Sequence, residues 1–352
     1  MMKINVAIAG VGNLAAGLVE ALQFYQEHDA TKHGVQYPSL GGYLLKDINI
    51  VAAFDIDARK VGKDITEAIR ITLNKREPFV KDLKPLNVKV LKGPLEDGIS
   101  EMTKEFIPIS EESEVDIAEV LDKTNAHILI IALPTGANKA VYKYAEAAIK
   151  ADVAVINATP TPLARNPVWA KKFKQAKIPY VGDDLQSKAG GTVLHKGILD
   201  ALNDQGVRVI NTYQLDVSGG FEGLNTLDVE RRTLKRQVKE DTIRRAMPYD
   251  LNIASGTTDY LEFLGDRRIG HFYIYAKYFM DAPLKIDMRM ESYDSPNGAA
   301  TLVDTIRALQ IARNLVMSGP INEISSYYFK QPPIILNRTR AKEQFERFIN
   351  QY

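Results

Sequence analysis

The sequence predicts an α/β protein with a Rossmann-type doubly wound parallel sheet and a second α+β domain built on an antiparallel or mixed sheet. Three observations favour this fold class. A short apolar run at residues 4–9 leads into the glycine turn Gly10-x-Gly12-x-x-Ala15 and then into a segment with helical spacing. Further apolar runs that end in turns follow along the first half of the chain. In the second half, apolar and charged residues alternate instead.

The first half contains five candidate strands separated by helical segments. A buried strand that feeds a glycine turn and a helix is the usual start of a βαβ unit. The other four strands are expected at residues 48–54, 128–133, 153–157 and 179–184, with an Ala-rich helix at 139–150. A polar stretch at 28–42 is expected to be a long loop. Strands that alternate with helices indicate a parallel sheet.

The second half changes character after about residue 188. Strand-like alternation is found at 207–217 and 272–289, and helices are expected at 228–245 and 301–316. Residues 285–291 alternate apolar and charged side chains, which suits an antiparallel sheet with one wetted or interface face. We therefore expect residues 1–188 together with 296–352 to form one domain and residues 189–295 to form the other.

Composition excludes several classes of protein. The 352 residues are 45% hydrophobic, which is enough for a substantial core. Lys plus Arg number 45 and Asp plus Glu 44, so a net charge of +1 gives no overall attraction to nucleic acid or anionic membranes. The absence of cysteine excludes disulfides, thiolate metal sites and cysteine nucleophiles. With no signal peptide and no apolar run of about 20 residues, we expect a soluble, cytoplasmic protein.

The glycine turn is a candidate dinucleotide site. Glycines let the backbone approach a pyrophosphate, and the following helix N-terminus offers N–H donors. Asp55, at the end of the second strand, is the expected acceptor for a ribose hydroxyl, which favours NAD over NADP. It lies 43 residues after Gly12 instead of the usual ~20, and we attribute the excess to an inserted loop at 28–42. Arg59 and Lys60 leave NADP open, and a packed turn without a ligand is the alternative.

Two lysines in the second half are candidates for acid/base chemistry. Lys235 and Lys239 lie four residues apart, and so on one face of the expected helix. They border an apolar stripe that includes Leu234 and Val238, where loss of solvation can lower the pKa of an amine. They could equally bind a phosphate as point charges. The alternative is an ordinary solvated helix face.

Other polar positions have less specific interpretations. Asp183 and Asp184 end a predicted strand, where ligands of parallel sheets gather. The run Asp294-Ser295-Pro296-Asn297 is expected to be a turn followed by a helix N-cap. His127 and His195 lack partners at metal-binding spacing, and we expect both to be core or surface histidines.

Several segments in order resemble myo-inositol-phosphate synthases of the shorter prokaryotic type over essentially the whole chain. They are residues 6–13 (VAIAGVGN), 51–57 (VAAFDID), 181–184 (VGDD), 212–215 (TYQL), 293–297 (YDSPN) and 326–330 (SYYFK). The resemblance implies conversion of glucose 6-phosphate to an inositol monophosphate, as in inositol-3-phosphate synthase. NAD+ oxidises C5, the C6 carbon is enolised and attacks the C1 aldehyde, and the hydride returns to C5.

The same resemblance implies roles for individual residues. Lys235 and Lys330 match catalytic lysines, with Lys235 at the C5 oxygen, and Asp184 would orient a lysine or the nicotinamide. Lys239 and Ser187 match phosphate-binding positions. The implied cofactor-binding residues are Gly10, Gly12, Asn13, Leu14, Asp55, Pro134, Thr135, Thr161, Asp184 and Asp294. A divalent or monovalent cation could be held by Asp294 and Glu222. The resemblance also implies that the first domain binds NAD and that the second carries out catalysis and oligomerisation. It further implies a cytoplasmic homotetramer that serves inositol and phospholipid biosynthesis.

Three positions depart from the family pattern. Arg268 replaces an active-site lysine; it can clamp phosphate or serve catalysis as a cation, but a pKa above 12 prevents proton transfer. Residues 218–222 (SGGFE) replace an Asn-rich turn, so that Gly220 lacks an amide, and Gln186 replaces a lysine. Two alternatives therefore stay open: a diverged NAD-dependent enzyme acting on another sugar phosphate, and a non-catalytic sensor of NAD or a metabolite.

Overall fold

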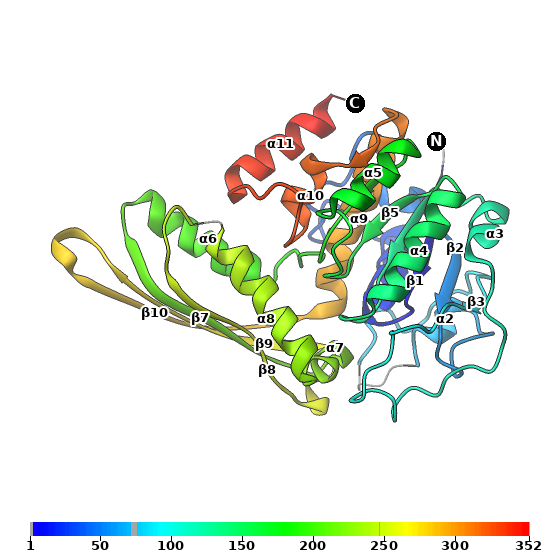
Figure 1. The fold of residues 1–352 in the computed structure, drawn as a ribbon, viewed down its shortest axis with the longest axis horizontal. Coiled ribbons are helices and arrows are strands. Elements are labelled where there is room, and N and C mark those ends of the chain that lie inside the picture. The colour runs from blue at the N-terminus through cyan, green and yellow to red at the C-terminus, as the bar shows by residue number, and fades with distance from the viewer. Residues whose placement is uncertain (1–2, 72–75, 246, 352) are drawn as a thin grey trace.

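The computed structural model describes residues 3–71, 76–245 and 247–351, which form two sheets side by side (Figure 1). In the first sheet the described residues make seven parallel strands in the order β11-β6-β5-β4-β1-β2-β3. These are β1 (Ile4–Ala9), β2 (Ile48–Asp55), β3 (Val90–Lys92), β4 (Ile128–Ile131), β5 (Ala154–Asn157), β6 (Pro179–Val181) and β11 (Gly319–Pro320). Because the order reverses between β1 and β4, the Rossmann-type topology is confirmed, with a crevice at the carboxyl ends of these two strands.

Helices cover the parallel sheet. They are α1 (Asn13–Glu27), α2 (Ile65–Ala68), α3 (Ile117–Lys123), α4 (Asn138–Lys150), α5 (Pro167–Gln175), α9 (Asp294–Asn314), α10 (Asn322–Tyr328) and α11 (Arg338–Asn350). Every residue of β4 and β5 is buried, as expected for central strands covered on both faces. Helix α9, from the last quarter of the chain, packs against α1, so residues from both ends of the chain share one core.

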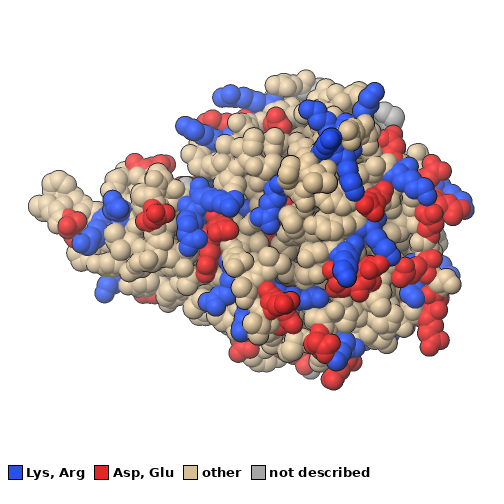
Figure 2. All heavy atoms as spheres, viewed as in Figure 1, with Lys and Arg blue, Asp and Glu red and all other residues tan. Residues whose placement is uncertain are grey.

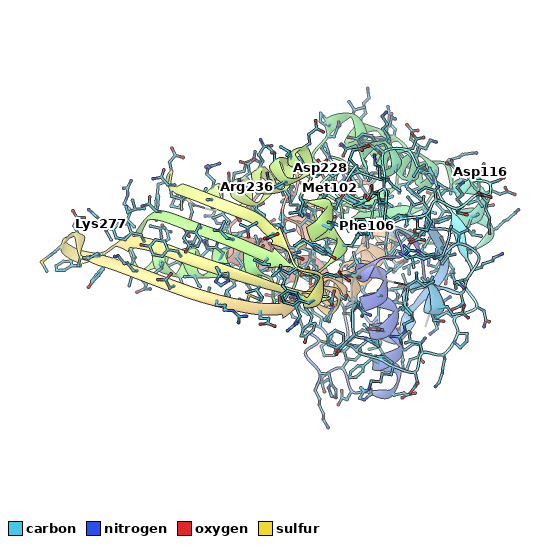
Figure 3. The ribbon with its side chains drawn as sticks, turned by 90° about the horizontal axis from the view of Figure 1, so that it is seen from below. Met102, Phe106, Asp116, Asp228, Arg236 and Lys277 are labelled. Carbon is cyan, nitrogen blue, oxygen red and sulfur yellow. The ribbon has the colours of Figure 1, made fainter. Side chains whose placement is uncertain are left out.

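The second sheet is mixed and has its own core. Its strands β7 (Arg208–Ser218), β8 (Asn252–Tyr260), β9 (Arg267–Lys277) and β10 (Pro283–Tyr293) lie in the order β10-β9-β7-β8, with β7 and β8 parallel and the other pairs antiparallel. Helices α6 (Gly191–Asp204) and α8 (Val229–Arg244) pack on one face, and α7 (Phe221–Asn225) follows β7. The sheet projects away from the Rossmann part, with Lys277 near its far tip and Asp228 near the junction (Figure 3).

Some elements differ from the expectation. The strand expected at 272–289 is two strands, β9 and β10, joined by a hairpin at 278–282. The turn and cap expected at 294–297 are wrong: these residues form the first turn of α9, whose N-cap is Tyr293. The carboxylate of Asp266 supplies the cap instead, since it accepts the Ser295 N–H at 3.0 Å from a distant part of the chain.

The expected loop at 28–42 contains no helix and no strand. It is fastened by Arg307 of α9, whose side chain is fully buried and donates to the carbonyls of Tyr37 (2.8 Å) and Tyr43 (3.3 Å). Asp304 accepts from the same guanidinium at 2.6 Å. The insertion that lengthens the path from the glycine turn to β2 is therefore tied to α9.

Charged side chains of both signs are interspersed over the face shown in Figure 2, as the balanced composition predicts. Among the described residues, no helix is long and apolar enough to cross a membrane.

Candidate active site

A cavity of about 390 Å³ opens where the carboxyl ends of the central parallel strands face the mixed sheet and α8. All but one of the site residues that the family resemblance implies line it. They are Gly10, Gly12, Asn13, Leu14, Asp55, Pro134, Thr135, Asp184, Ser187, Glu222, Lys235, Lys239, Arg268, Asp294 and Lys330. Thr161 does not; it is buried, and its hydroxyl donates to Asn138 Oδ1 at 2.7 Å. Residues up to 320 positions apart in the chain thus converge on one site.

The glycine turn has two different requirements for glycine. Gly10 has φ +96°, and a Cβ there would lie 2.4 Å from the carbonyl oxygen of Ala132. Gly12 is the N-cap of α1 and offers no side-chain cap, and a Cβ there would meet nothing within 4 Å. Gly10 is therefore needed for the fold, whereas Gly12 keeps the N-terminus of α1 open to the cavity. That geometry fits a pyrophosphate.

Asp55 is arranged as a charged acceptor. Its carboxylate accepts the N–H groups of Val11 (2.8 Å) and Ile56 (2.7 Å), and Lys60 Nζ lies 3.6 Å away. Burial by itself would raise the pKa of Asp55, but Lys60 and the backbone donors outweigh it and hold the pKa below its usual range. Arg59 is engaged by Asp57 at 2.6 Å. The residues present fit a ribose at this position.

One oxygen of Asp184 joins two lysines. Oδ1 accepts from Lys330 Nζ at 3.0 Å and from Lys235 Nζ at 3.5 Å, while Oδ2 is buried without a hydrogen-bond partner in the described part of the chain. The neighbouring Asp183 turns into the protein, where Asn157 Nδ2 and the Ala164 N–H donate to it at 2.7 and 2.9 Å. The strand end thus supplies one structural and one cavity-facing carboxylate.

The two lysines at Asp184 have different acidities. Burial lowers the pKa of Lys330 to about 8, although Asp184 opposes this. For Lys235 burial acts the same way, but Asp184 and Glu222, at 3.5 and 3.7 Å, outweigh it and raise the pKa. Burial would raise the pKa of Asp184, and the two lysines hold it below its usual range instead. A lasting cation beside a group that titrates near neutral pH is a typical acid/base arrangement.

A second carboxylate, Asp216, joins Lys239 and Arg268. It is 2% exposed, accepts a hydrogen bond from Lys239 Nζ, and lies 3.7 Å from Arg268 Nη1. Burial lowers the pKa of Lys239, partly offset by Asp216. Arg268 is also held by Asp294, through Nε at 3.0 Å and Nη2 at 2.8 Å. Sequence reasoning missed Asp216; the available signal was its two-residue spacing from Gln214, which places both side chains on one face of β7.

The solvated-face interpretation of the two α8 lysines is wrong. The side chains of Lys235 and Lys239 are 16% and 7% exposed and reach Asp184 and Asp216, respectively. Both project from α8 into the cavity, not into solvent.

The N-terminus of α6 also faces the cavity. Gly190 is its N-cap without a side-chain cap, and Gly190, Gly191 and Thr192 line the cavity together with Ser187 and Lys239. Free N–H groups at a helix N-terminus beside a lysine suit a phosphate group. The cavity thus has two helix N-termini for anionic groups, at α1 and at α6.

The donors expected for a cation are engaged otherwise. Asp294 is held by Arg268, and Glu222 accepts from the Thr135 hydroxyl and lies 3.7 Å from Lys235 Nζ. Within the described residues, no group of three or more His, Asp or Glu side chains could hold a metal ion. Asp294 and Glu222 therefore do not fit a bound cation.

The two histidines have structural partners. Buried His195 shares a hydrogen bond of 2.7 Å with the Thr212 hydroxyl, and burial lowers its pKa to about 4. His127 accepts the Asn5 N–H at Nδ1, at 3.2 Å.

Gly220 leaves room in the cavity. Its φ of −72° suits any residue, and a Cβ there would lie 3.6 Å from Asn13 Nδ2 and 3.9 Å from Asp294 Oδ2, which are ordinary contacts. This departure from the family pattern opens space beside Asn13 without straining the backbone.

The fold and the site define an α/β enzyme of the Rossmann class with buried lysines at its cavity. The family model for myo-inositol-1-phosphate synthase matches residues 190–295. The inositol-3-phosphate synthase of Mycolicibacterium smegmatis is 37% identical over 99% of this chain and 98% of its own length. That of Corynebacterium glutamicum is 36% identical, covering 98% of each. The chain belongs to the myo-inositol-1-phosphate synthase family.

Solved structures show the same fold. The crystal structure of Ari2 is 28% identical with a TM-score of 0.81, covering 99% of this chain and 98% of that one. The inositol-3-phosphate synthase of Caenorhabditis elegans is 13% identical with a TM-score of 0.80, covering 99% of this chain and 85% of that one. The latter supports the fold alone.

Proposed function

We propose that this protein converts glucose 6-phosphate to an inositol monophosphate, with NAD as a resident cofactor and no net oxidation. The observation that carries the proposal is the pair of lysines on one Asp184 oxygen, between two uncapped helix N-termini. One N-terminus suits a cofactor pyrophosphate and the other a substrate phosphate. The inositol-3-phosphate synthases named above support the same reaction.

NAD would be held by the Rossmann part of the cavity. The N–H groups that follow Gly12 would bind the pyrophosphate, and the charged Asp55 would accept from a ribose hydroxyl. Asn13, Leu14, Pro134, Thr135 and Asp294 line the remainder. When bound, the nicotinamide supplies a hydride acceptor for a substrate carbon and later the donor that reduces the same carbon. Thr161 would contribute to this site only indirectly, through its hydrogen bond to Asn138.

The substrate phosphate would lie at the N-terminus of α6. Ser187, the N–H groups after Gly190 and the amine of Lys239 converge there. Asp216 forms ion pairs with Lys239 and Arg268 and so positions both cations at the cavity. Arg268 cannot transfer protons, so its role is electrostatic: it stabilises negative charge on a substrate oxygen, or clamps phosphate.

Proton transfer would fall to the lysines at Asp184. With a pKa of about 8, Lys330 can take the substrate proton beside the ketone and return a proton to an oxygen. Lys235 stays charged and donates to the C5 oxygen, which stabilises the negative charge that develops there during enolisation. The hydroxyl proton that C5 loses together with the hydride would pass to solvent and return when C5 is reduced again. Asp184 sets the distance between the two amines by accepting from both.

We also propose a division of the chain into two domains with different roles. Residues 1–188 with 296–352 would form the NAD-binding domain, and residues 189–295 the catalytic and oligomerisation domain. A homotetramer and a cytoplasmic location remain predictions.

A second candidate is a related enzyme acting on another sugar phosphate. Arg268 in place of lysine and the open space at Gly220 favour it, because both change what meets the substrate. Purified protein is incubated with NAD+ and glucose 6-phosphate, or with other sugar phosphates, without external oxidant or reductant, and products are followed by phosphorus NMR. Inositol phosphate without net NADH supports the first function. Conversion of another sugar phosphate alone supports the second, and tight NAD binding without any turnover supports a sensor.

A further inference from the structure

A second cavity of about 220 Å³ lies between α6, α10, α11 and the segment at 186–188. Its wall carries three cationic side chains, Lys188, Lys196 and Arg338, together with polar groups of Gln186, Ser187 and Tyr327. None of the described residues that line it is acidic. Helix α11 lies beside α10 (Figure 1) and also contacts α6. A cavity walled by cations without a lining carboxylate is suited to an anion.

The charge of these cations is only partly compensated. Lys188 Nζ is paired with Asp304 behind the wall, but that carboxylate also holds Arg307 at 2.6 Å and Tyr328 Oη at 3.2 Å. Asp200, on the same helix as Lys196, is the acidic neighbour of both Lys196 and Arg338 and accepts the backbone N–H of Arg338. Within the described residues, neither cation has an ion pair within 4 Å.

Arg338, the first residue of α11, is exposed and lines this cavity. Its side chain makes no ion pair and no hydrogen bond within the described part of the chain, and Nη1 lies 3.8 Å from the Cβ position of Gly197 on α6. It thus faces α6, which also carries Lys196. Burial lowers the pKa of both Lys188 and Lys196. Asp304 and Asp200, respectively, offset part of this effect, whereas Arg338 acts in the same direction as burial on both amines, so each amine is repelled by the guanidinium. An anion between them would relieve that repulsion.

We propose that this cavity is a second anion site, separate from the catalytic cavity, which binds inorganic phosphate or a phosphate monoester through Lys188, Lys196 and Arg338. Gln186 and Ser187 line both cavities, so the two sites share a wall. An anion bound here would therefore lie beside Ser187, which is proposed to bind the substrate phosphate in the catalytic cavity. The site itself does not depend on the proposed reaction.

Equilibrium dialysis with radiolabelled inorganic phosphate at constant ionic strength tests the proposal. The double variant Lys196→Gln/Arg338→Gln should bind one phosphate fewer per chain than the wild type. Arg340→Gln/Lys342→Gln, also on α11 and with the same change in net charge, should bind as many as the wild type. Lys239→Gln should lose the phosphate of the catalytic cavity instead. NAD binding by each variant reports that it is folded.

Equal stoichiometry in Lys196→Gln/Arg338→Gln and wild type would overturn the second site. An equal loss in both α11 variants would also overturn it, because net charge would then be the cause. If Lys239→Gln binds like the wild type while Lys196→Gln/Arg338→Gln does not, the second site stands and the proposed phosphate role of Lys239 fails.

Discussion

Lys330 and Lys235 share one carboxylate oxygen yet differ in acidity, because Lys235 has Glu222 as a further anionic neighbour. Burial dominates for Lys330 and lowers its pKa to about 8. Both residues are lysines, so the balance between desolvation and neighbouring charges determines which of them has a pKa that allows proton exchange near neutral pH.

Replacing Lys330 with alanine should lower kcat by roughly 10²- to 10⁴-fold, the usual contribution of a general acid or base. NAD affinity, measured by fluorescence titration, should change little, because the glycine turn and Asp55 are untouched. Lys60→Gln serves as the opposite control, since Lys60 contacts Asp55 and should affect NAD binding more. Retained turnover in Lys330→Ala would remove this lysine from the mechanism.

The pH dependence of kcat/KM gives a second test at Lys330. Below a pKa of about 8 the amine is protonated and cannot accept a proton, so kcat/KM should rise with pH and level off above about 8. Lys330→Arg keeps the charge but removes this titration, so its residual activity should show no break near pH 8. A break that persists in Lys330→Arg would belong to another group.

At the scale of elements, the strand–turn–helix from β1 to α1 is where sequence reasoning succeeded most fully. Its signals are local: an apolar run, two glycines and helical spacing. The cap of α9 could not be found in this way, because Asp266 reaches Ser295 from 29 residues upstream. β8 also escaped prediction, since its residues Asn252–Tyr260 are mostly small or polar and obtain their strand conformation from pairing with β7.

The two glycines of that turn should behave differently when replaced by alanine. Gly12→Ala should leave the free energy of unfolding nearly unchanged but weaken NAD binding at least about tenfold, or ~1.4 kcal/mol, because the methyl group enters the cofactor space. Gly10→Ala should destabilise the protein itself, since its Cβ meets the Ala132 carbonyl. Urea unfolding and calorimetric titration measure the two effects. Wild-type NAD affinity in Gly12→Ala would place the pyrophosphate elsewhere.

At the scale of the whole molecule, the site is assembled from parts that sequence spacing cannot connect. Lys330 follows α10, Lys235 is on α8 and Asp184 follows β6. Their convergence was expected only from the family resemblance, because no local pattern links them. The family resemblance did not point to Asp216, although this carboxylate pairs with both Lys239 and Arg268. The sheet order and the packing of α9 on α1 supply the missing information.

Arg307 ties the loop at 28–42 and the adjoining Tyr43 to α9 through its fully buried guanidinium. Arg307→Met should lower the free energy of unfolding by about 3–5 kcal/mol, because the carbonyls of Tyr37 and Tyr43 lose their donor and Asp304 loses a partner. Arg340→Met, at an exposed position of α11, should change it by less than about 0.5 kcal/mol. Urea unfolding compares them, and equal stability of both variants would show that the loop at 28–42 does not need this anchor.

The central claim is a closed redox cycle in one cavity. Glucose 6-phosphate carrying deuterium at C5 is supplied to the protein with less NAD+ than substrate, and the product is analysed by NMR. The account predicts many turnovers per NAD+, an inositol phosphate that keeps its deuterium on the same carbon, and no accumulation of NADH. NADH formed in step with product, or product that has lost the deuterium, would contradict it.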